Sequence, residues 1–399
     1  MRRMHLSPGS VWLTVLLGLL VALTPLGTDS YVPTLPAIAQ AFGATVAEVQ
    51  FTITTFFFGI AAGQLAWGPL SDRFGRKPAL LCGLVLFLGS AAACLGAESV
   101  AGITWWRFVQ GLGMSSGPVI ARTIVRDLHS HEKAARMLAR MMVVFGIVPI
   151  AAPLIGAQLL AWWDWRGTFG LLATVAVCLV ASVATGLKET VPQRTATISP
   201  ARIAHTFASI LRERRFIAPF CVLLGVQVGI FAFVTNSSFV LVKALGLSAR
   251  EYSFLFALVM VGQIAGAWFT SRMVMRLGIA GMLRFGTRLA CAAGLLAAVL
   301  AWSGAGHWLA IVVPFMAFMF AASCVVPNAT AAALSPFPAS AGTASSLLGA
   351  CAFLLGASVS IVLGALFDGT ARPMATALAL AGLGALLAER FLMRRPGVA

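Results

Sequence analysis

This chain of 399 residues carries very little charge: Asp, Glu, Lys and Arg make up only 10% of it, whereas 60% of its residues are hydrophobic. A soluble globular domain has about 25% charged residues. The shortage of charge therefore excludes an ordinary soluble fold. It predicts a protein for which lipid is much of the solvent.

The usual signatures of metal and nucleotide chemistry are missing as well. The seven cysteines fall inside apolar runs, without the spacing of a metal site or a disulfide framework, and we expect them to be small packing residues. No Gly-x-x-x-x-Gly-Lys-(Ser/Thr) loop occurs, which excludes an ATP-driven pump in a single chain. Because no nucleophile–base pair is recognisable either, we expect no enzyme, no bound metal and no cofactor.

Long apolar runs dominate the sequence. A helix needs roughly 20 apolar residues to span a bilayer, and twelve such segments can be placed. The predicted fold class is an all-α polytopic membrane protein with twelve transmembrane helices. The segments are 10–30, 48–71, 78–97, 101–124, 136–160, 166–187, 216–241, 251–272, 280–303, 307–332, 342–366 and 373–392.

The net charge of +16 is explained by orientation in the membrane rather than by nucleic-acid binding. Most of the 28 Lys and Arg residues lie in segments that alternate onto one side, including Arg2, Arg3, Arg394 and Arg395 at the ends. By the positive-inside rule this side is cytoplasmic, which places both termini in the cytoplasm. The first apolar run resembles a signal peptide, but it lacks a small-residue cleavage site and is predicted to be a retained helix.

A faint internal repeat divides the chain into two halves. Gly59 and Gly63 correspond at a constant offset to Gly262 and Gly266, and the same offset pairs Asp72 with Met275. We expect a six-helix bundle over residues 1–190, a cytoplasmic linker over 191–214 and a second, pseudo-symmetric six-helix bundle over 215–399. Within the linker, residues 199–213 form either an amphipathic helix on the inner membrane surface or a flexible connection.

One acidic residue falls at membrane depth. Asp29 follows the apolar run 11–27, whereas the other acids of the chain lie in loops or at segment ends. A carboxylate in this position is costly and is a functional candidate by default, and a proton-coupling site needs a group that takes up and releases a proton. The alternative is a helix that ends near Gly27, with Asp29 as a solvated cap residue.

Arg107 is the natural counter-charge for Asp29, because it lies at a similar depth in the fourth segment. Arg107, Gln110 and Gly111 share one helical face. Since arginine keeps its proton, it would tune a neighbouring carboxylate or attract an anion. The alternative is a side chain that extends to the membrane interface.

Two further segments carry unusual patterns. The fifth run contains Gly146, Pro149, Pro153 and Gly156, whose prolines bend a helix and whose glycines allow close packing. Between the second and third runs lies the charged hairpin Gly68-Pro-Leu-Ser-Asp72-Arg73-Phe-Gly75-Arg76-Lys77-Pro78. We expect Asp127, at the end of the fourth run, to bridge to Arg76 and tie the hairpin to that helix. Asp72 is expected to sit against the helix that begins near Gly342, where the helix dipole favours an anion.

These motifs resemble the major facilitator superfamily, and in particular its bicyclomycin/chloramphenicol-resistance (Bcr/CflA) branch of drug:proton antiporters. The hairpin is similar to the signature Gly-x-Leu-(Ala/Ser)-Asp-Arg-x-Gly-Arg-Lys, and the fifth run is similar to the antiporter motif. Arg107 resembles the fourth-helix arginine that the family associates with proton transfer, and Asp29 matches the Asp-x-Tyr-(Leu/Val)-Pro-x-x-Pro stretch of the drug-efflux branch. The resemblance implies the major facilitator fold, a gating role for Gly68, Asp72, Arg73, Gly75, Arg76 and Asp127, and a monomer in the bacterial inner membrane.

The resulting expectation is export of small amphipathic drugs of the phenicol, bicyclomycin or sulfonamide kind, driven by protons, with the substrate near the midplane. The alternative is a metabolite, sugar or amino-acid carrier on the same scaffold; a receptor, a membrane enzyme or a channel fits less well. A mostly apolar cavity suits amphipathic substrates. Candidate cavity residues are Tyr31, Gln110, Asn236, Gln263, Asn328 and Phe353.

Overall fold

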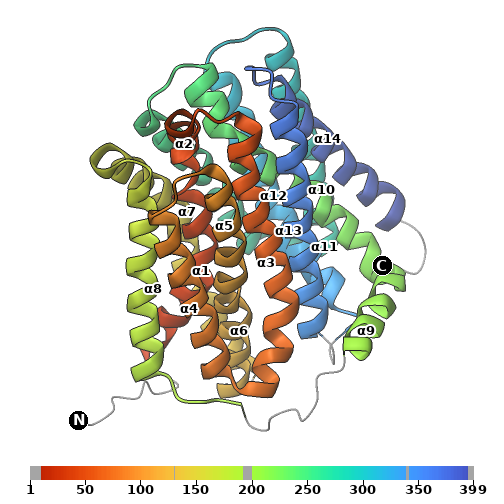
Figure 1. Cartoon of the computed structure of the whole chain (residues 1–399). Coiled ribbons are helices and arrows are strands. Elements are labelled where there is room, and N and C mark those ends of the chain that lie inside the picture. Colours follow the sequence, from red (N-terminus) through yellow and green to blue (C-terminus); the bar gives the residue numbers. More distant parts are fainter. Residues whose placement is uncertain (1–9, 130, 192–199, 338–340, 394–399) are drawn as a thin grey trace. The chain divides into compact units, whose positions relative to one another are not determined.

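The computed structural model describes residues 10–129, 131–191, 200–337 and 341–393. Within these ranges the chain forms helices and no strand (Figure 1), which confirms the all-α prediction. Ten helices are long and apolar enough to cross a membrane. The terminal arginines at positions 2, 3, 394 and 395, and the part of the predicted linker at 192–199, lie outside the described residues.

The chain divides into two compact units, Met1–Ser199 and Pro200–Ala399. The helices of the N-terminal unit are α1 (Val11–Asp29), η1 (Val32–Thr34), α2 (Leu35–Phe42), α3 (Val46–Phe74), α4 (Arg76–Leu95), α5 (Val100–Met114), α6 (Ser116–Leu128), α7 (His131–Trp163) and α8 (Arg166–Gly186). Those of the C-terminal unit are α9 (Pro200–Arg212), α10 (Arg214–Ser238), η2 (Phe239–Ala244), α11 (Ala249–Trp302), α12 (Leu309–Leu334), α13 (Ala341–Ala365), α14 (Arg372–Ala388) and η4 (Glu389–Met393).

The difference between ten long helices and twelve predicted segments has two causes. Helix α11 contains both predicted segments 251–272 and 280–303, which are joined by a kink at Gly278, whose φ of 67° is not helical. The predicted segment 101–124 is instead divided at Ser115 into α5 and α6, which are 15 and 13 residues long. Each predicted segment therefore has a helical counterpart.

The hairpin between α3 and α4 is tighter than predicted. The predicted segments end at 71 and begin again at 78, but α3 stays helical to Phe74 and α4 begins at Arg76. Gly75 alone makes the connection, with φ 105° and ψ 154°, a conformation that residues with a Cβ rarely adopt. The charged side chains of this hairpin are therefore held on the ends of two helices.

Most of the predicted linker segment 199–213 is helical. Residues 200–212 form the helix α9, so a flexible connection is wrong for this stretch. Its Ile210 is buried, whereas Leu211 is 40% exposed, because α9 packs with one side against α10 and α13. A position on the membrane surface stays a prediction.

The repeated glycines explain why the two units share a packing pattern. In the N-terminal unit α3 lies so close to α5 that a Cβ on Gly59 would overlap the carbonyl of Phe108. In the C-terminal unit a Cβ on Gly262 would overlap the carbonyl of Met316 on α12. Close approach lets side chains bond across the helices. The Trp67 indole donates to the Leu112 carbonyl at 2.7 Å.

We expect Gly59→Ala to lower the thermal midpoint of the purified protein by several degrees. The added methyl meets backbone that cannot move aside, and overpacking of this kind costs about 1–3 kcal/mol. Gly89→Ala is the matched control: nothing lies within 4 Å of a Cβ there, and Ala favours the helix. Equal midpoints for the two variants would contradict the close α3–α5 contact.

Candidate functional site

Asp29 is the last residue of α1 and is only 7% exposed. Helix α1 runs through Pro25 and does not end at Gly27, so the alternative of a solvated cap residue is wrong. The chain continues through Ser30 and Tyr31, both fully buried, into the turn η1. The acid is thus buried and lies at a break between two helical segments of the N-terminal unit.

Arg107 has no exposed surface. Its guanidinium lies between two aromatic rings, with its central carbon 3.7 Å from the ring centre of Phe56 and 4.3 Å from that of Tyr31. The Nη1 group donates to the Gly27 carbonyl at 3.2 Å and to Gln110 Oε1 at 2.6 Å. The alternative of a side chain that extends to the interface is therefore wrong.

The expected pairing of Arg107 with Asp29 is not present. No ion pair joins them among the described residues. Instead the Nε and Nη2 groups of Arg107 and the Nε2 group of Gln110 are buried without a hydrogen-bond partner in the described part of the chain. A buried N–H group without an acceptor costs about 1–3 kcal/mol. The arginine consequently offers unused donors within the same unit as a buried acid.

The sequence positions this arginine through its neighbours. A Cβ on Gly111 would overlap the carbonyl of Phe56, so glycine on α5 allows α3 to approach and brings the Phe56 ring over the guanidinium. The Tyr31 ring is fixed from the other side: its hydroxyl shares a 2.8 Å hydrogen bond with Thr52, and its ring packs 5.5 Å from that of Phe169.

The candidate cavity residues are distributed over both units. Tyr31 and Gln110 belong to the buried arginine cluster just described, in the N-terminal unit. In the C-terminal unit Asn236 and Asn328 are buried, and the Asn328 amide donates to the Cys324 carbonyl of its own helix at 2.8 Å. The remaining two candidates, Gln263 and Phe353, are partly exposed. A shared substrate cavity stays a prediction.

The proline-rich helix predicted from Gly146 to Gly156 is α7, which remains helical through Pro149 and Pro153. A Cβ on Gly156 would overlap the carbonyl of Ser30, beside Asp29, so this glycine is needed for close packing. No described atom of the N-terminal unit lies within 4 Å of a Cβ on Gly146. The expectation of tight packing is thus correct for Gly156 and wrong for Gly146.

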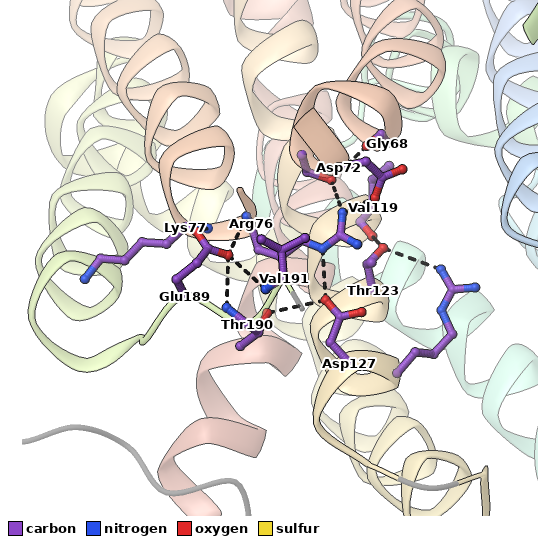
Figure 2. Close-up of polar contacts among 12 residues, drawn as sticks. Gly68, Asp72, Arg76, Lys77, Val119, Thr123, Asp127, Glu189, Thr190 and Val191 are labelled. Carbon is purple, nitrogen blue, oxygen red and sulfur yellow. Dashed lines mark hydrogen bonds and ion pairs between the residues drawn. The ribbon is translucent and has the colours of Figure 1, made fainter. Parts of the chain in front are cut away.

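A second polar cluster surrounds Arg76 at the start of α4 (Figure 2). Its Nε donates to Asp127 Oδ2 at 2.9 Å, which confirms the predicted bridge to the fourth segment. Its Nη1 donates to Ser71 Oγ at 2.8 Å and forms an ion pair with Asp72. One largely buried guanidinium therefore ties together the ends of α3, α4 and α6. We call these residues together with Glu189 the Arg76 cluster.

Glu189 is the functional candidate that sequence reasoning missed, because it falls at the end of the predicted N-terminal bundle, in a loop after α8. Its Oε1 accepts from the backbone N–H of Arg76 at 2.8 Å, and its Oε2 from that of Lys77 at 3.3 Å (Figure 2). The first N–H groups of a helix have no partner within it, and Gly75 has no side chain to supply one. The absence of a capping side chain at Gly75 was the only sequence signal that another residue, here Glu189, caps α4.

Hydrogen bonds run both ways between the start of α4 and the end of α8 with its following loop. The Lys77 ammonium donates to the carbonyls of Ala184 at 2.7 Å and Leu187 at 2.8 Å, where a cation complements the end of α8. Thr190 Oγ1 lies 3.4 Å from Asp127 Oδ2 and so connects Glu189 with the bridge. Arg73 is exposed, and Gly68 has no close neighbour that a Cβ would meet.

Two helical units, long apolar helices and a charged hairpin at a single glycine define a multi-pass membrane protein. The sequence matches the Major Facilitator Superfamily over residues 17–361, so the chain belongs to this superfamily. The expectation of a transporter rather than an enzyme is thereby confirmed.

Individual relatives agree with this assignment. A bicyclomycin resistance protein homolog of Haemophilus influenzae is 31% identical, over 95% of both chains. Multidrug resistance protein D of Escherichia coli is 31% identical, over 85% of both. The solved structure of a D-xylose-proton symporter has the same fold, with a TM-score of 0.77 and 16% identity over 96% of both chains.

We expect the stability contribution of Glu189 to depend on pH. Burial alone would raise the pKa of Glu189, but hydrogen bonds from the backbone N–H groups of Val191, Arg76, Thr190 and Lys77 hold it below its usual range. A carboxyl whose pKa is lowered by folding stabilises the protein above its unfolded pKa of about 4.3, and this contribution is lost as the pH falls through the folded value. Glu189→Gln should therefore lower the thermal midpoint at neutral pH, by the equivalent of about 1 kcal/mol.

Thermal midpoints measured between about pH 3 and pH 7 check this expectation, because the curves for wild type and Glu189→Gln should converge in acid. Glu98→Gln, at an exposed loop position, removes the same charge and should follow the wild type throughout. A constant offset at every pH would contradict the role of the carboxylate.

Proposed function

We propose that this protein exports small amphipathic drugs in exchange for protons. The substrates we expect are of the phenicol, bicyclomycin or sulfonamide kind. Support comes from the relatives, which are named for bicyclomycin resistance and multidrug resistance and align over most of the chain. A fold shared with a sugar symporter does not by itself fix the substrate.

The observation that carries the proposal is the burial of both an acid and a cation in the N-terminal unit without an ion pair between them. Asp29 is buried, and the Nε and Nη2 groups of Arg107 have no hydrogen-bond partner among the described residues. An acid that is permanently paired with arginine resists protonation, whereas an unpaired one exchanges its proton more readily. In the proposed cycle Asp29 takes up the proton, and Arg107 attracts the acid again when the proton leaves.

The remaining parts of the cycle follow the same scheme. The two units alternate access to a substrate site near the midplane, with Tyr31, Gln110, Asn236, Gln263, Asn328 and Phe353 as candidate contacts. The Arg76 cluster is the gating hairpin, and α7 carries the antiporter motif. A single coupling acid favours neutral or singly charged substrates.

The setting is the inner membrane of a bacterium, with a monomer whose termini are both cytoplasmic. The domains of the proposed carrier are residues 1–190 and 215–399, with 191–214 as their connection. The proton gradient supplies the energy, so the cycle requires no cofactor.

Substrate-triggered proton movement in liposomes tests the proposal. Internal pH is followed while phenicols, bicyclomycin, sulfonamides and lipophilic cations are added in turn. We expect a response to at least one class, and we expect Asp29→Asn to reduce it to the level of empty liposomes, because an amide cannot carry the proton.

Asp368→Asn is the matched control, since this aspartate is exposed in the loop between α13 and α14 and should leave the response unchanged. A response that survives Asp29→Asn would move the coupling acid elsewhere. Silence with every drug class would favour the metabolite carrier.

A further inference from the structure

The C-terminal unit has its own charged hairpin, within α11, and it lacks the acids that neutralise the first. Four arginines flank the kink at Gly278, and we call residues 272–288 the arginine hairpin. Its arginines are Arg272, Arg276, Arg284 and Arg288. All four are exposed. Each pair is spaced by four residues, so its members lie on one helical face.

The internal repeat allows the two hairpins to be compared position by position. The acids of the Arg76 cluster are Asp72, Asp127 and Glu189, and the constant offset of the repeat places Met275, Thr330 and Leu392 at the corresponding positions. The hairpin geometry is kept, because Gly278 has a positive φ as Gly75 does. The C-terminal unit has thus preserved the turn and replaced every acid of the cluster with an uncharged residue.

Nothing in the described C-terminal unit compensates the four arginines. Helix α11 has no acid after Glu251, and α12 and α14, which pack against it, have none. The acid of η4, Glu389, is buried. No ion pair to the arginine hairpin occurs among the described residues of this unit. The charges of the arginine hairpin are therefore open to anions from outside the unit.

Apolar side chains lie between the arginines. Met275 is 89% exposed, Leu277 44% and Ile279 40%. Trp268, one turn before Arg272, is 60% exposed and carries the Arg272 guanidinium 5.1 Å from its ring centre. Tryptophan and arginine beside exposed aliphatic groups are typical of the boundary between headgroups and acyl chains. A free anion would use the arginines but not the apolar groups.

We propose that the arginine hairpin binds the phosphate groups of anionic phospholipids, with Met275, Leu277 and Ile279 in the upper acyl region. Arginine suits this ligand because its planar fork matches a phosphate. Basic residues next to a membrane attract anionic lipid additively. In the N-terminal hairpin, by contrast, Arg76 is paired with Asp72 and Asp127, so acids of the same unit offset its charge.

The full-length protein in detergent is titrated with phosphatidylglycerol or phosphatidylcholine, and bound lipids are counted by native mass spectrometry. We expect Arg276→Gln/Arg284→Gln to weaken phosphatidylglycerol binding at least tenfold and to leave phosphatidylcholine binding unchanged. Arg136→Gln/Arg140→Gln removes two exposed arginines from α7 and should retain wild-type binding. Equal thermal midpoints without lipid show that each variant is folded.

Three results would overturn the proposal. One is equal loss of binding in both double variants, which would reflect net charge alone. Another is equal affinity for phosphatidylglycerol and phosphatidylcholine. The last is displacement of phosphatidylglycerol by inorganic phosphate at equal concentration, which would make the site one for a free anion. If a double variant fails to fold, Arg276→Gln alone is compared with Arg136→Gln.

Discussion

A guanidinium enclosed by protein at membrane depth is the constraint on which the N-terminal unit depends. Arg107 keeps its charge, and charge in a low-dielectric interior requires compensation. The unit supplies two rings, one backbone carbonyl and one amide oxygen, drawn from four segments of the chain. Glycines at the α3–α5 contact permit this arrangement, because a side chain at Gly111 would separate Phe56 from the arginine. Even so, two donor groups of Arg107 have no acceptor in the described part of the chain. A cation kept at this cost is expected where its charge is needed for function.

The two units also differ in how the charges of their hairpins are compensated. In the N-terminal unit, acids surround Arg76 and occupy the first N–H groups of α4, so the hairpin is neutralised and held from three sides. In the C-terminal unit the equivalent turn keeps its glycine and has four exposed arginines without acids. The two hairpins share their backbone geometry but differ in charge, which indicates different functions. The acids of the N-terminal unit bind the hairpin at Gly75, whereas the arginine hairpin at Gly278 is open to an external anion.

Much of this structure could be predicted because a long apolar segment in lipid must satisfy its own backbone hydrogen bonds, and a helix does so. The lengths of the apolar runs alone predict the position of each spanning segment. The charged residues of the hairpin and of the fourth run predict the bridge from Arg76 to Asp127. Two features could not be found in that way. The pairing of Arg107 with Asp29 was expected from their similar depth, but depth says nothing of the rotamer that places Arg107 between Phe56 and Tyr31. Glu189 was overlooked because its partners are backbone N–H groups more than a hundred residues away, and the missing cap side chain at Gly75 does not say which distant acid takes its place.

The most direct test is accumulation of drug driven by an imposed pH gradient in liposomes containing Arg107→Met, with the thermal midpoint measured on the same preparation. Methionine fills much of the same space and removes the two donor groups of Arg107 that have no acceptor among the described residues, each of which costs about 1–3 kcal/mol when buried. This gain offsets the loss of the hydrogen bonds to Gly27 and Gln110. We expect a midpoint at or above that of the wild type, together with loss of gradient-driven accumulation. Wild-type accumulation by the variant, or a midpoint well below that of the wild type, would contradict the conclusion that this charge is retained for coupling rather than for stability.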